Sequence, residues 1–334
     1  MSKILISVIA YKEKDLFGTI FDCYSKAKNK ENIYFSIVEE DHPENYSNLN
    51  FVPDNQILYR KYDLSEYRGI LWARNKTTET HFEYDYILFI CAHTRFVENW
   101  DELCLQEYQK AIIKNESDNV VLTYCGPDYR FNNDGSIEYA PEDAKNTNVY
   151  VKHYLEDFTP GYHFPRGWVI PESPNDKDVR EGVWLHYTWC FANKNFLKEV
   201  PIDPDINFNA EEPYMSIQAW CRGWRFYATP VVLYYHDTFK QYPGEDKPRF
   251  ETHRPWVDKN KIDYWNHSDS SMIKLNLLLS GKLEDKFGIE KNKILKYCDA
   301  TGLNIKATEY NPDYDKIDKY QHCKHLKDQP IIET

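Results

Sequence analysis

Residues 84–96, YDYILFICAHTRF, form an apolar run that ends at a small group of polar side chains. The aliphatic and aromatic residues of the run hardly alternate with polar ones, which is typical of a strand buried on both faces of an α/β sheet. Cys91, His93 and Arg95 follow at its carboxyl end. Ligands of open parallel sheets bind at that edge, because the crossover connections leave a crevice there. A thiol, an imidazole and a guanidinium at this point favour a site for a cation and the phosphate that it neutralises.

The segments around this run predict strands that alternate with helices. Alternating strands and helices argue for a mostly parallel central sheet with helices on both faces. Ser65 is the expected N-cap of the helix that precedes the run. No GxGxxG motif follows the first strand, so the dinucleotide-binding fingerprint is absent. We expect strands over residues 3–11, 33–39, 56–62, 120–125 and 231–235, and helices over 16–30, 65–80, 100–112, 268–279 and 291–301.

Residues 126–181 and the helix beyond them complete the pattern. The segment 126–181 is rich in Pro, Gly, Asn, Asp and aromatic residues, and its length is typical of a lid or binding loop. A further helix is expected after Ala210, with Gly223 as its stop. The expected strand at residues 231–235 ends at His236.

Composition limits the partners of the protein. The chain has 334 residues with 41 basic and 53 acidic side chains, a net charge of −12, so phosphate polymers and anionic membranes repel the molecule as a whole. Any contact with nucleic acid must therefore come from a local patch, and residues 240–254 form the most basic loop. Aromatic residues reach 16%, which favours sugar-like ligands or reflects a biased genome.

The cysteines and the N-terminus bear on the compartment. The eight cysteines are scattered and include no CxxC pair, and the first residues do not form a signal peptide. No run approaches the roughly eighteen apolar residues that a membrane span needs. We therefore expect a cytoplasmic protein with reduced thiols and no membrane partner, in the host cytoplasm if the protein is viral.

Several motifs follow one another in a characteristic order. They are ISVIAYKEKDL, RGILWARN, FICAHTRF, FANKNFLKEVPIDPDINFNAEEPYMSIQAW and TPVVLYYHD. Taken together, they resemble the motifs of a GT-A glycosyltransferase. The sequence is similar to the cytoplasmic hydroxyproline N-acetylglucosaminyltransferase family, which is distantly related to the polypeptide N-acetylgalactosaminyltransferases, and the resemblance covers most of the chain.

The resemblance implies a GT-A fold, an activity and a set of site residues. It implies a catalytic domain at residues 1–240, with a nucleotide-binding half at 1–125 and a donor-sugar and acceptor half at 126–240, followed by a helical extension at 241–334. It also implies a UDP-sugar donor, a hydroxyl acceptor, retention of anomeric configuration, and Mn²⁺ or Mg²⁺ as the cation. The implied residues are Cys91, His93 and His236 for the metal, Glu211 and Glu212 for catalysis, and Ala10, Tyr11, Arg68, Arg74, Arg95 and Trp189 for the donor.

Some of these residues have structural alternatives. His236 is also explained as a core histidine, and the three arginines as structural or surface residues. The two glutamates are also explained as favourable charges at a helix N-terminus.

The chain departs from the family at three points. Cys91 stands where the family has an aspartate, and a thiolate is a softer ligand that suits Mn²⁺ and Mg²⁺ poorly. Trp189 and Cys190 occupy the place of a family glycine, and Ala210 replaces another glycine. Two of the changes add bulk, so we predict a donor sugar smaller than an N-acetylhexosamine, such as a pentose.

The acceptor and the activity itself stay open at this point. The acceptor is a protein hydroxyl, as in the family, or a hydroxymethylated base of phage DNA, for example 5-hydroxymethylcytosine that becomes arabinosylated. A non-catalytic glycan- or nucleotide-binding protein on a degenerate GT-A fold is a further alternative, because Cys91 weakens the metal site. The transferase hypothesis requires His93, His236 and Glu211 to converge around one diphosphate.

Overall fold

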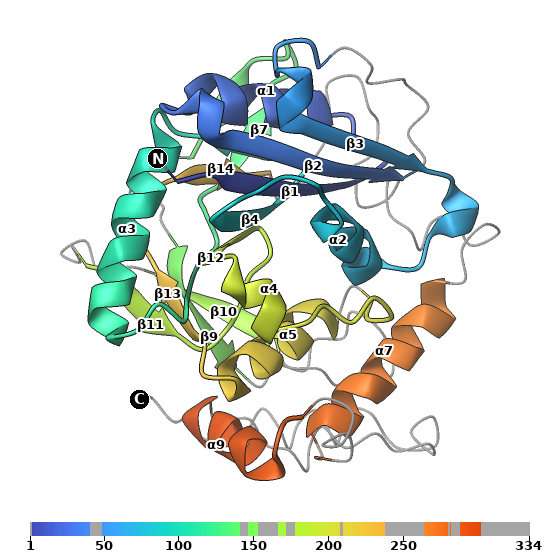
Figure 1. Cartoon of the computed structure of the whole chain (residues 1–334), viewed down its shortest axis with the longest axis vertical. Coiled ribbons are helices and arrows are strands. Elements are labelled where there is room, and N and C mark those ends of the chain that lie inside the picture. Colours follow the sequence, from blue (N-terminus) through green and yellow to red (C-terminus); the bar gives the residue numbers. More distant parts are fainter. Residues whose placement is uncertain are drawn as a thin grey trace.

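An eight-stranded mixed sheet lies at the centre of the molecule (Figure 1). Four of its neighbouring pairs are parallel, and the strand that begins at Trp189 is antiparallel to both of its neighbours. The predicted mostly parallel α/β sheet is therefore confirmed. In spatial order the strands are β11 (Arg180–Gly182), β13 (Arg225–Ala228), β6 (Val120–Thr123), β12 (Trp189–Asn193), β4 (Tyr86–Cys91), β1 (Ile4–Tyr11), β2 (Ile33–Glu40) and β3 (Ile57–Tyr62).

The structure is a computed structural model that describes most of the chain. The described residues are 2–40, 49–140, 146–152, 166–171, 178–207, 210–237, 264–279, 281 and 288–301. The basic loop expected at 240–254 lies outside these ranges. Within them, no helix is both long and apolar enough to cross a membrane.

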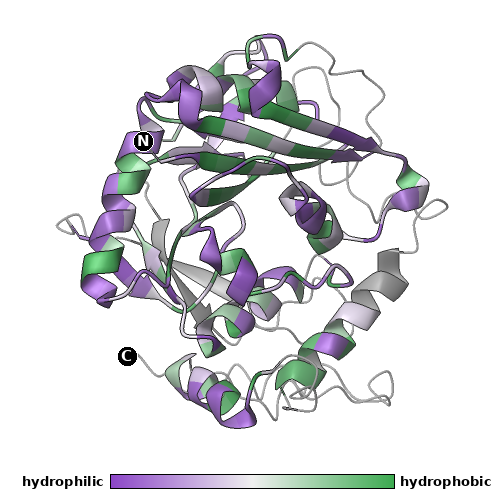
Figure 2. Ribbon diagram, in the orientation of Figure 1, coloured by the Kyte–Doolittle hydropathy of each residue, from purple (hydrophilic) through white to green (hydrophobic). Residues whose placement is uncertain are grey.

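Alternate residues of the strands point into two hydrophobic layers, as the apolar runs predict. Ile4, Ile6 and Val8 of β1 pack against helices α1 (Leu16–Lys26) and α3 (Trp100–Asn115) on one face. Leu5 of the same strand packs on the opposite face, under α2 (Ile70–Thr78), α4 (Asn195–Glu199) and α5 (Glu211–Cys221). The strands are mainly hydrophobic while α3 carries many hydrophilic residues (Figure 2), so the sheet is buried on both faces.

The C-terminal helices share the core of the second face. Leu275 and Leu278 of α7 (Tyr264–Leu279) and Tyr297 of α9 (Lys291–Thr301) belong to the same buried cluster as the residues of α5. Lys274 of α7 also forms an ion pair with Asp203 at 3.1 Å. These two helices are thus packed on the helix layer of the sheet (Figure 1).

A short second sheet begins directly after β4. β4 ends at Cys91, the hydroxyl of Thr94 donates to the carbonyl of Cys91 at 2.8 Å, and the chain turns between them. The next three residues form β5 (Thr94–Phe96), which pairs antiparallel with β14 (Tyr234–His236). β4 therefore ends where the sequence predicts, at the polar residues that follow the apolar run.

The helix predicted at 65–80 begins later than expected. A 3-10 helix (Leu64–Glu66) comes first, and the carboxylate of Asp63 accepts from the backbone of Ser65 at 2.9 Å. Asp63 is therefore the N-cap of the 3-10 helix, and Ser65 is the N-cap of neither helix. The α-helix α2 starts only after Gly69, whose φ of 114° is a conformation that favours glycine.

The segment 126–181 contains more regular structure than a loop. Its described parts form two antiparallel pairs and the edge strand β11. The strands are very short or separated by turn residues, which hides their periodicity in the sequence. The pairs are β7 (Tyr129–Phe131) with β8 (Ile137–Tyr139), and β9 (Asn146–Lys152) with β10 (Arg166–Pro171).

Candidate functional site

Cys91, His93 and His236 meet at the carboxyl end of β4. One ligand atom from each residue lies within 4.8 Å of the others, and the two imidazole rings are 4.8 Å apart. The pairing of β5 with β14 brings His236 here from more than a hundred residues away, opposite Thr94. His93 and His236 are buried, with only 9% and 8% of each residue exposed. The sequence-predicted metal ligands therefore form one cluster.

Glu13 supports this cluster and was not singled out from the sequence. Its Oε2 lies 2.9 Å from Nδ1 of His93, and Glu13 is buried just beyond the end of β1. A carboxylate at Nδ1 favours the tautomer with the lone pair on Nε2, which is the form that binds a metal. The available signal was an acidic residue in the turn after the first strand, at the same edge of the sheet as His93.

Arg74 and Glu211 form a buried ion pair between α2 and α5. The Nε atom of Arg74 lies 2.5 Å from Oε1 of Glu211, and the side chains are 1% and 6% exposed. The guanidinium also lies over the ring of Tyr187, 4.2 Å from its centroid. Burial raises the pKa of Glu211 to about 7, although the positive charge of Arg74 acts in the opposite direction.

The same guanidinium connects the ion pair to the cysteine of the cluster. Burial lowers the pKa of Arg74, but the charges of Glu211 and then Cys91 raise it, with a net increase. Among the described residues, no group accepts a hydrogen bond from the buried Nη1 atom of Arg74. Cys91 is thus close to the two histidines and also acts electrostatically on Arg74, the partner of Glu211.

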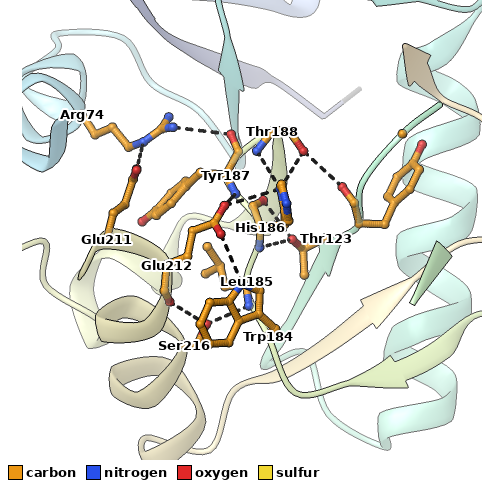
Figure 3. Close-up of polar contacts among 12 residues, drawn as sticks. Arg74, Thr123, Trp184, Leu185, His186, Tyr187, Thr188, Glu211, Glu212 and Ser216 are labelled. Atoms are coloured by element: carbon orange, nitrogen blue, oxygen red, sulfur yellow. Dashed lines mark hydrogen bonds and ion pairs between the residues drawn. The ribbon is translucent and has the colours of Figure 1, made fainter. Parts of the chain in front are cut away.

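Glu212 holds a neighbouring segment of backbone (Figure 3). Its Oε1 accepts from the backbone N–H of Tyr187 at 3.1 Å, and its Oε2 accepts from Nε1 of Trp184 at 3.2 Å. Both bonds lie at the N-terminal end of α5, where carboxylates are favourable. Glu211 and Glu212 therefore have different partners: the first pairs with Arg74, and the second orders residues 184–188.

Further bonds fix residues 184–188 between β11 and β12 (Figure 3). The hydroxyl of Thr123 donates to the carbonyl of His186 at 3.0 Å and accepts from its N–H at 2.8 Å. Ser216 of α5 accepts from the N–H of Leu185 at 2.8 Å. The hydroxyl of Thr188 lies 2.8 Å from Nδ1 of His186. The sequence did not predict the role of residues 184–188, because they contain no recognisable motif.

Arg95 lies in a buried ion pair on the α1 side of the sheet. Its Nη2 is 2.5 Å from Oδ1 of Asp15, and the hydroxyl of Tyr129 donates to the other oxygen of Asp15 at 2.5 Å. The guanidinium also lies over the ring of Tyr129, at 5.0 Å. These contacts correspond to the structural alternative for Arg95 and do not support its predicted contact with donor phosphate.

Trp189 is a core residue in this structure. It is 0% exposed, stacks on Tyr234 with ring centroids 4.7 Å apart, and packs edge-on against Trp100. Cys190 and Ala210 are also 0% exposed. The three residues that replace family glycines therefore fill the interior. The predicted donor contact of Trp189, and the pentose argument based on added bulk, find no support in this arrangement.

The candidates for the nucleotide lie at the ends of β1 and β2. Ala10 and Tyr11 pair with Glu39 and Glu40, which end β2. Burial raises the pKa of Glu39 to about 7, against the charge of Lys61, and raises the pKa of Glu40 to about 8. The two glutamates were not singled out as site residues, although an acidic pair that ends a buried strand was a usable signal.

Tyr11 and Arg68 lie at the margin of this region. Tyr11 is partly buried and meets Tyr67 edge-on, with ring centroids 5.9 Å apart. Arg68 is exposed and lies just before α2, outside the helix. The structure therefore separates Arg68 and Arg74, which the sequence placed on one helix.

Comparisons with known proteins agree with this fold. The model of the Glycosyltransferase (GlcNAc) family matches residues 44–279. No curated protein matches the chain. The structure of GalNAc-T7 with UDP, GalNAc and Mn²⁺ is similar with a TM-score of 0.54 and 12% identity, over 97% of this chain and 58% of GalNAc-T7. The structure of residues 1–349 of S. aureus TarS with UDP-GlcNAc has a TM-score of 0.47 and 13% identity, over 94% and 77% of the two chains.

These comparisons identify the fold and the family. The chain spans less than two thirds of GalNAc-T7, and at 12% identity the likeness establishes the fold alone. It confirms the expected GT-A fold. Because the family model matches well over half of the residues, the chain belongs to the Glycosyltransferase (GlcNAc) family.

Proposed function

We propose that this protein transfers a sugar from a nucleoside-diphosphate donor, a UDP-sugar, to a hydroxyl group. The observation that carries the proposal is the convergence of Cys91, His93 and His236 with the Arg74–Glu211 pair at the end of β4. Family membership supports the reaction class. The UDP and Mn²⁺ named with GalNAc-T7 support the donor type and a cation.

The donor atoms of the cluster fit a divalent cation. Two imidazoles and a thiol are ligands for a borderline or soft metal ion, whereas Mn²⁺ and Mg²⁺ favour oxygen ligands. When bound, such a cation would neutralise the diphosphate leaving group.

Arg74 supplies positive charge on the other side of Cys91. Cleavage of the bond between sugar and diphosphate builds negative charge on the leaving group and positive charge on the sugar, so the site must stabilise both. The Nη1 atom of Arg74 donates to an oxygen of the donor, while its Nε remains with Glu211. Glu211 thereby orients the guanidinium, and Glu212 holds residues 184–188 rigid beside it.

The nucleotide base binds next to Ala10 and Tyr11 in this proposal. Glu40 keeps its proton to about pH 8, because burial raises its pKa, so at neutral pH it donates a hydrogen bond to a base oxygen. Arg68 is exposed ahead of α2 and contributes to the phosphate side. Retention of configuration and a likeness to the hydroxyproline N-acetylglucosaminyltransferases form part of the same proposal.

Donor hydrolysis tests the proposal without knowledge of the acceptor. The purified chain should release UDP from at least one sugar in a panel of UDP-hexoses, UDP-N-acetylhexosamines and UDP-pentoses. His236→Ala and Arg74→Met should each lower the rate by at least about 100-fold, in line with the loss of one preorganised electrostatic group. His81→Ala is the matched control, since His81 is exposed and packs only against Phe82 among the described rings.

Two results would overturn the proposal. Equal rates of UDP release for His236→Ala and His81→Ala would show that the cluster takes no part in the reaction. Donor binding without any UDP release, across the panel and with added cations, would favour the non-catalytic binding protein. Once a donor is known, a hydroxyproline peptide and hydroxymethylated DNA decide the acceptor by which of them gains the labelled sugar.

A further inference from the structure

We propose that Cys91, His93 and His236 form a site selective for a thiophilic divalent cation, Zn²⁺ or Co²⁺, in which Glu13 positions His93. This rests on the proposed function in that it names the cation of the same site. Binding alone can test it, because the thiolate gives a spectroscopic signal that does not depend on sugar transfer.

The geometry suits three protein ligands around one tetrahedral ion. Zinc bonds of about 2.0–2.3 Å to nitrogen and sulfur place the ligand atoms of a tetrahedral site about 3.3–3.6 Å apart. The atoms of the cluster lie within 4.8 Å of one another, so side-chain rotations that shorten these distances by about 1 Å close the site. Three protein ligands leave a fourth position open, as in catalytic zinc sites, for an oxygen of the donor.

The chemistry of the donor atoms sets the preference. A thiolate and two imidazoles favour Zn²⁺ and Co²⁺, whereas Mn²⁺ and Mg²⁺ are better held by carboxylates and water. Cys91 is in no disulfide and is partly accessible.

Glu13 completes a carboxylate–histidine arrangement like that of many metal sites. Its Oε2 lies 2.9 Å from Nδ1 of His93, which directs Nε2 as the metal ligand. The backbone holds Glu13 in place, because the N–H of Lys12 donates to the carbonyl of Glu40 at 3.0 Å. Lys12 itself adopts a φ of 48°, which turns the chain sharply after β1.

The backbone around the histidines is equally fixed. The N–H of His236 donates to the carbonyl of Pro127 at 2.9 Å, and the N–H of Asp237 donates to the carbonyl of His93 at 3.2 Å. Together with the Thr94 bond to Cys91, these bonds hold the backbone at each of the three ligands before any ion binds. Such preorganisation lowers the cost of ordering the ligands on binding.

Titration of the chelator-treated full chain with Co²⁺ tests the site. We expect a thiolate-to-cobalt charge-transfer band in the near ultraviolet and intense visible bands of tetrahedral cobalt, at one ion per chain. Zn²⁺ should abolish both at stoichiometric concentration, whereas a large excess of Mn²⁺ or Mg²⁺ should not. Co²⁺ that binds without a charge-transfer band, or Mn²⁺ that competes as well as Zn²⁺, would overturn the proposal.

Variants separate the roles of the residues. Cys91→Ser should remove the charge-transfer band, and Cys125→Ser, at another partly exposed cysteine outside any disulfide, should keep it. Glu13→Gln should keep the band but weaken Co²⁺ affinity about 10- to 100-fold, the usual effect of losing such a supporting carboxylate. Unchanged affinity in Glu13→Gln would remove Glu13 from the site.

The two proposals fail in different ways. A thiolate–cobalt band without UDP release from any donor would leave the cation site intact and remove the transferase activity. UDP release that depends on Mn²⁺, in a chain that shows no band, would leave the activity intact and overturn the cation proposal. If Cys91→Ser does not fold, the band of the unmodified chain and the Zn²⁺ competition still decide the outcome.

Discussion

Arg74 and Glu211 meet with 2.5 Å between Nε and Oε1, although they lie 137 positions apart in the chain. The pair joins α2 to α5 across one face of the sheet, and both side chains are almost completely buried. Buried charges are tolerated when they are paired, and they are costly when one partner is lost. This relationship makes the interior of the site sensitive to single substitutions.

Arg74→Met should therefore lower the free energy of unfolding by about 3–5 kcal/mol, as should Glu211→Leu, because each leaves one buried charge unpaired. The double variant should cost clearly less than the sum of the two. Urea unfolding of the four proteins measures this coupling. The exposed pair of Arg130 and Glu138, with 2.9 Å between nitrogen and oxygen, is the control, and its single variants should leave stability nearly unchanged. Additive effects of Arg74→Met and Glu211→Leu would contradict the ion pair.

Glu212 should act by positioning residues 184–188. Glu212→Ala removes two hydrogen bonds, to the N–H of Tyr187 and to the indole of Trp184, and should lower kcat for UDP release about 10-fold or more. Trp184→Phe removes only the indole bond and should reproduce a smaller part of the loss. Steady-state kinetics of both variants measure the effect. A full loss in Glu212→Ala with no change in Trp184→Phe would instead indicate direct chemistry by Glu212.

Glu40 should make stability depend on pH. Burial raises its pKa to about 8 in the folded protein from the ordinary value of 4.5, so between these values the folded state holds more protons than the unfolded chain. Stability from this group is full below about pH 4.5 and falls, by up to about 1.4 kcal/mol per pH unit, as the pH rises to about 8.

Glu40→Gln should remove that fall, so the variant gains stability relative to the parent as the pH rises. Thermal or urea unfolding between pH 5 and about pH 8 measures the difference. Glu98→Gln, at an exposed glutamate, should leave the pH profile of the parent unchanged. Parallel profiles for the parent and Glu40→Gln would contradict the raised pKa.

Gly18 should resist substitution although it lies inside α1. A Cβ atom there would lie 2.5 Å from Oδ1 of Asp15 and 2.7 Å from Nη2 of Arg95. Gly18→Ala should thus destabilise the protein by disturbing the buried Asp15–Arg95 pair. This effect opposes the helix propensity of alanine, which is about 1 kcal/mol more favourable than that of glycine. The melting temperature measures the change, with Gln109→Ala on the exposed side of α3 as the control. A higher melting temperature for Gly18→Ala would show that the pair can move aside.

The buried strands were the easiest part of the fold to predict. The unbroken apolar runs of β1, β2 and β4 place hydrophobic side chains on both faces of the sheet, so each face must be covered by another layer. The structure covers them on both faces. The segment 126–181 was mispredicted, because three-residue strands such as β7 and β8 are too short for an alternating pattern to appear. β12 was missed for a related reason: it is an antiparallel strand inserted between parallel ones, and its position depends on its neighbours.

The sequence alone predicted the sheet class and indicated Cys91, His93 and His236, since apolar runs and the motifs at their ends are local properties of the chain. Only the tertiary structure decided what each polar side chain faces. It brings Glu13 into contact with His93, Glu211 with Arg74, and Arg95 with Asp15. It also places Trp189 in the core. These assignments depend on contacts between segments far apart in the chain. Burial then makes each charged group depend on the one partner that the fold brings to it.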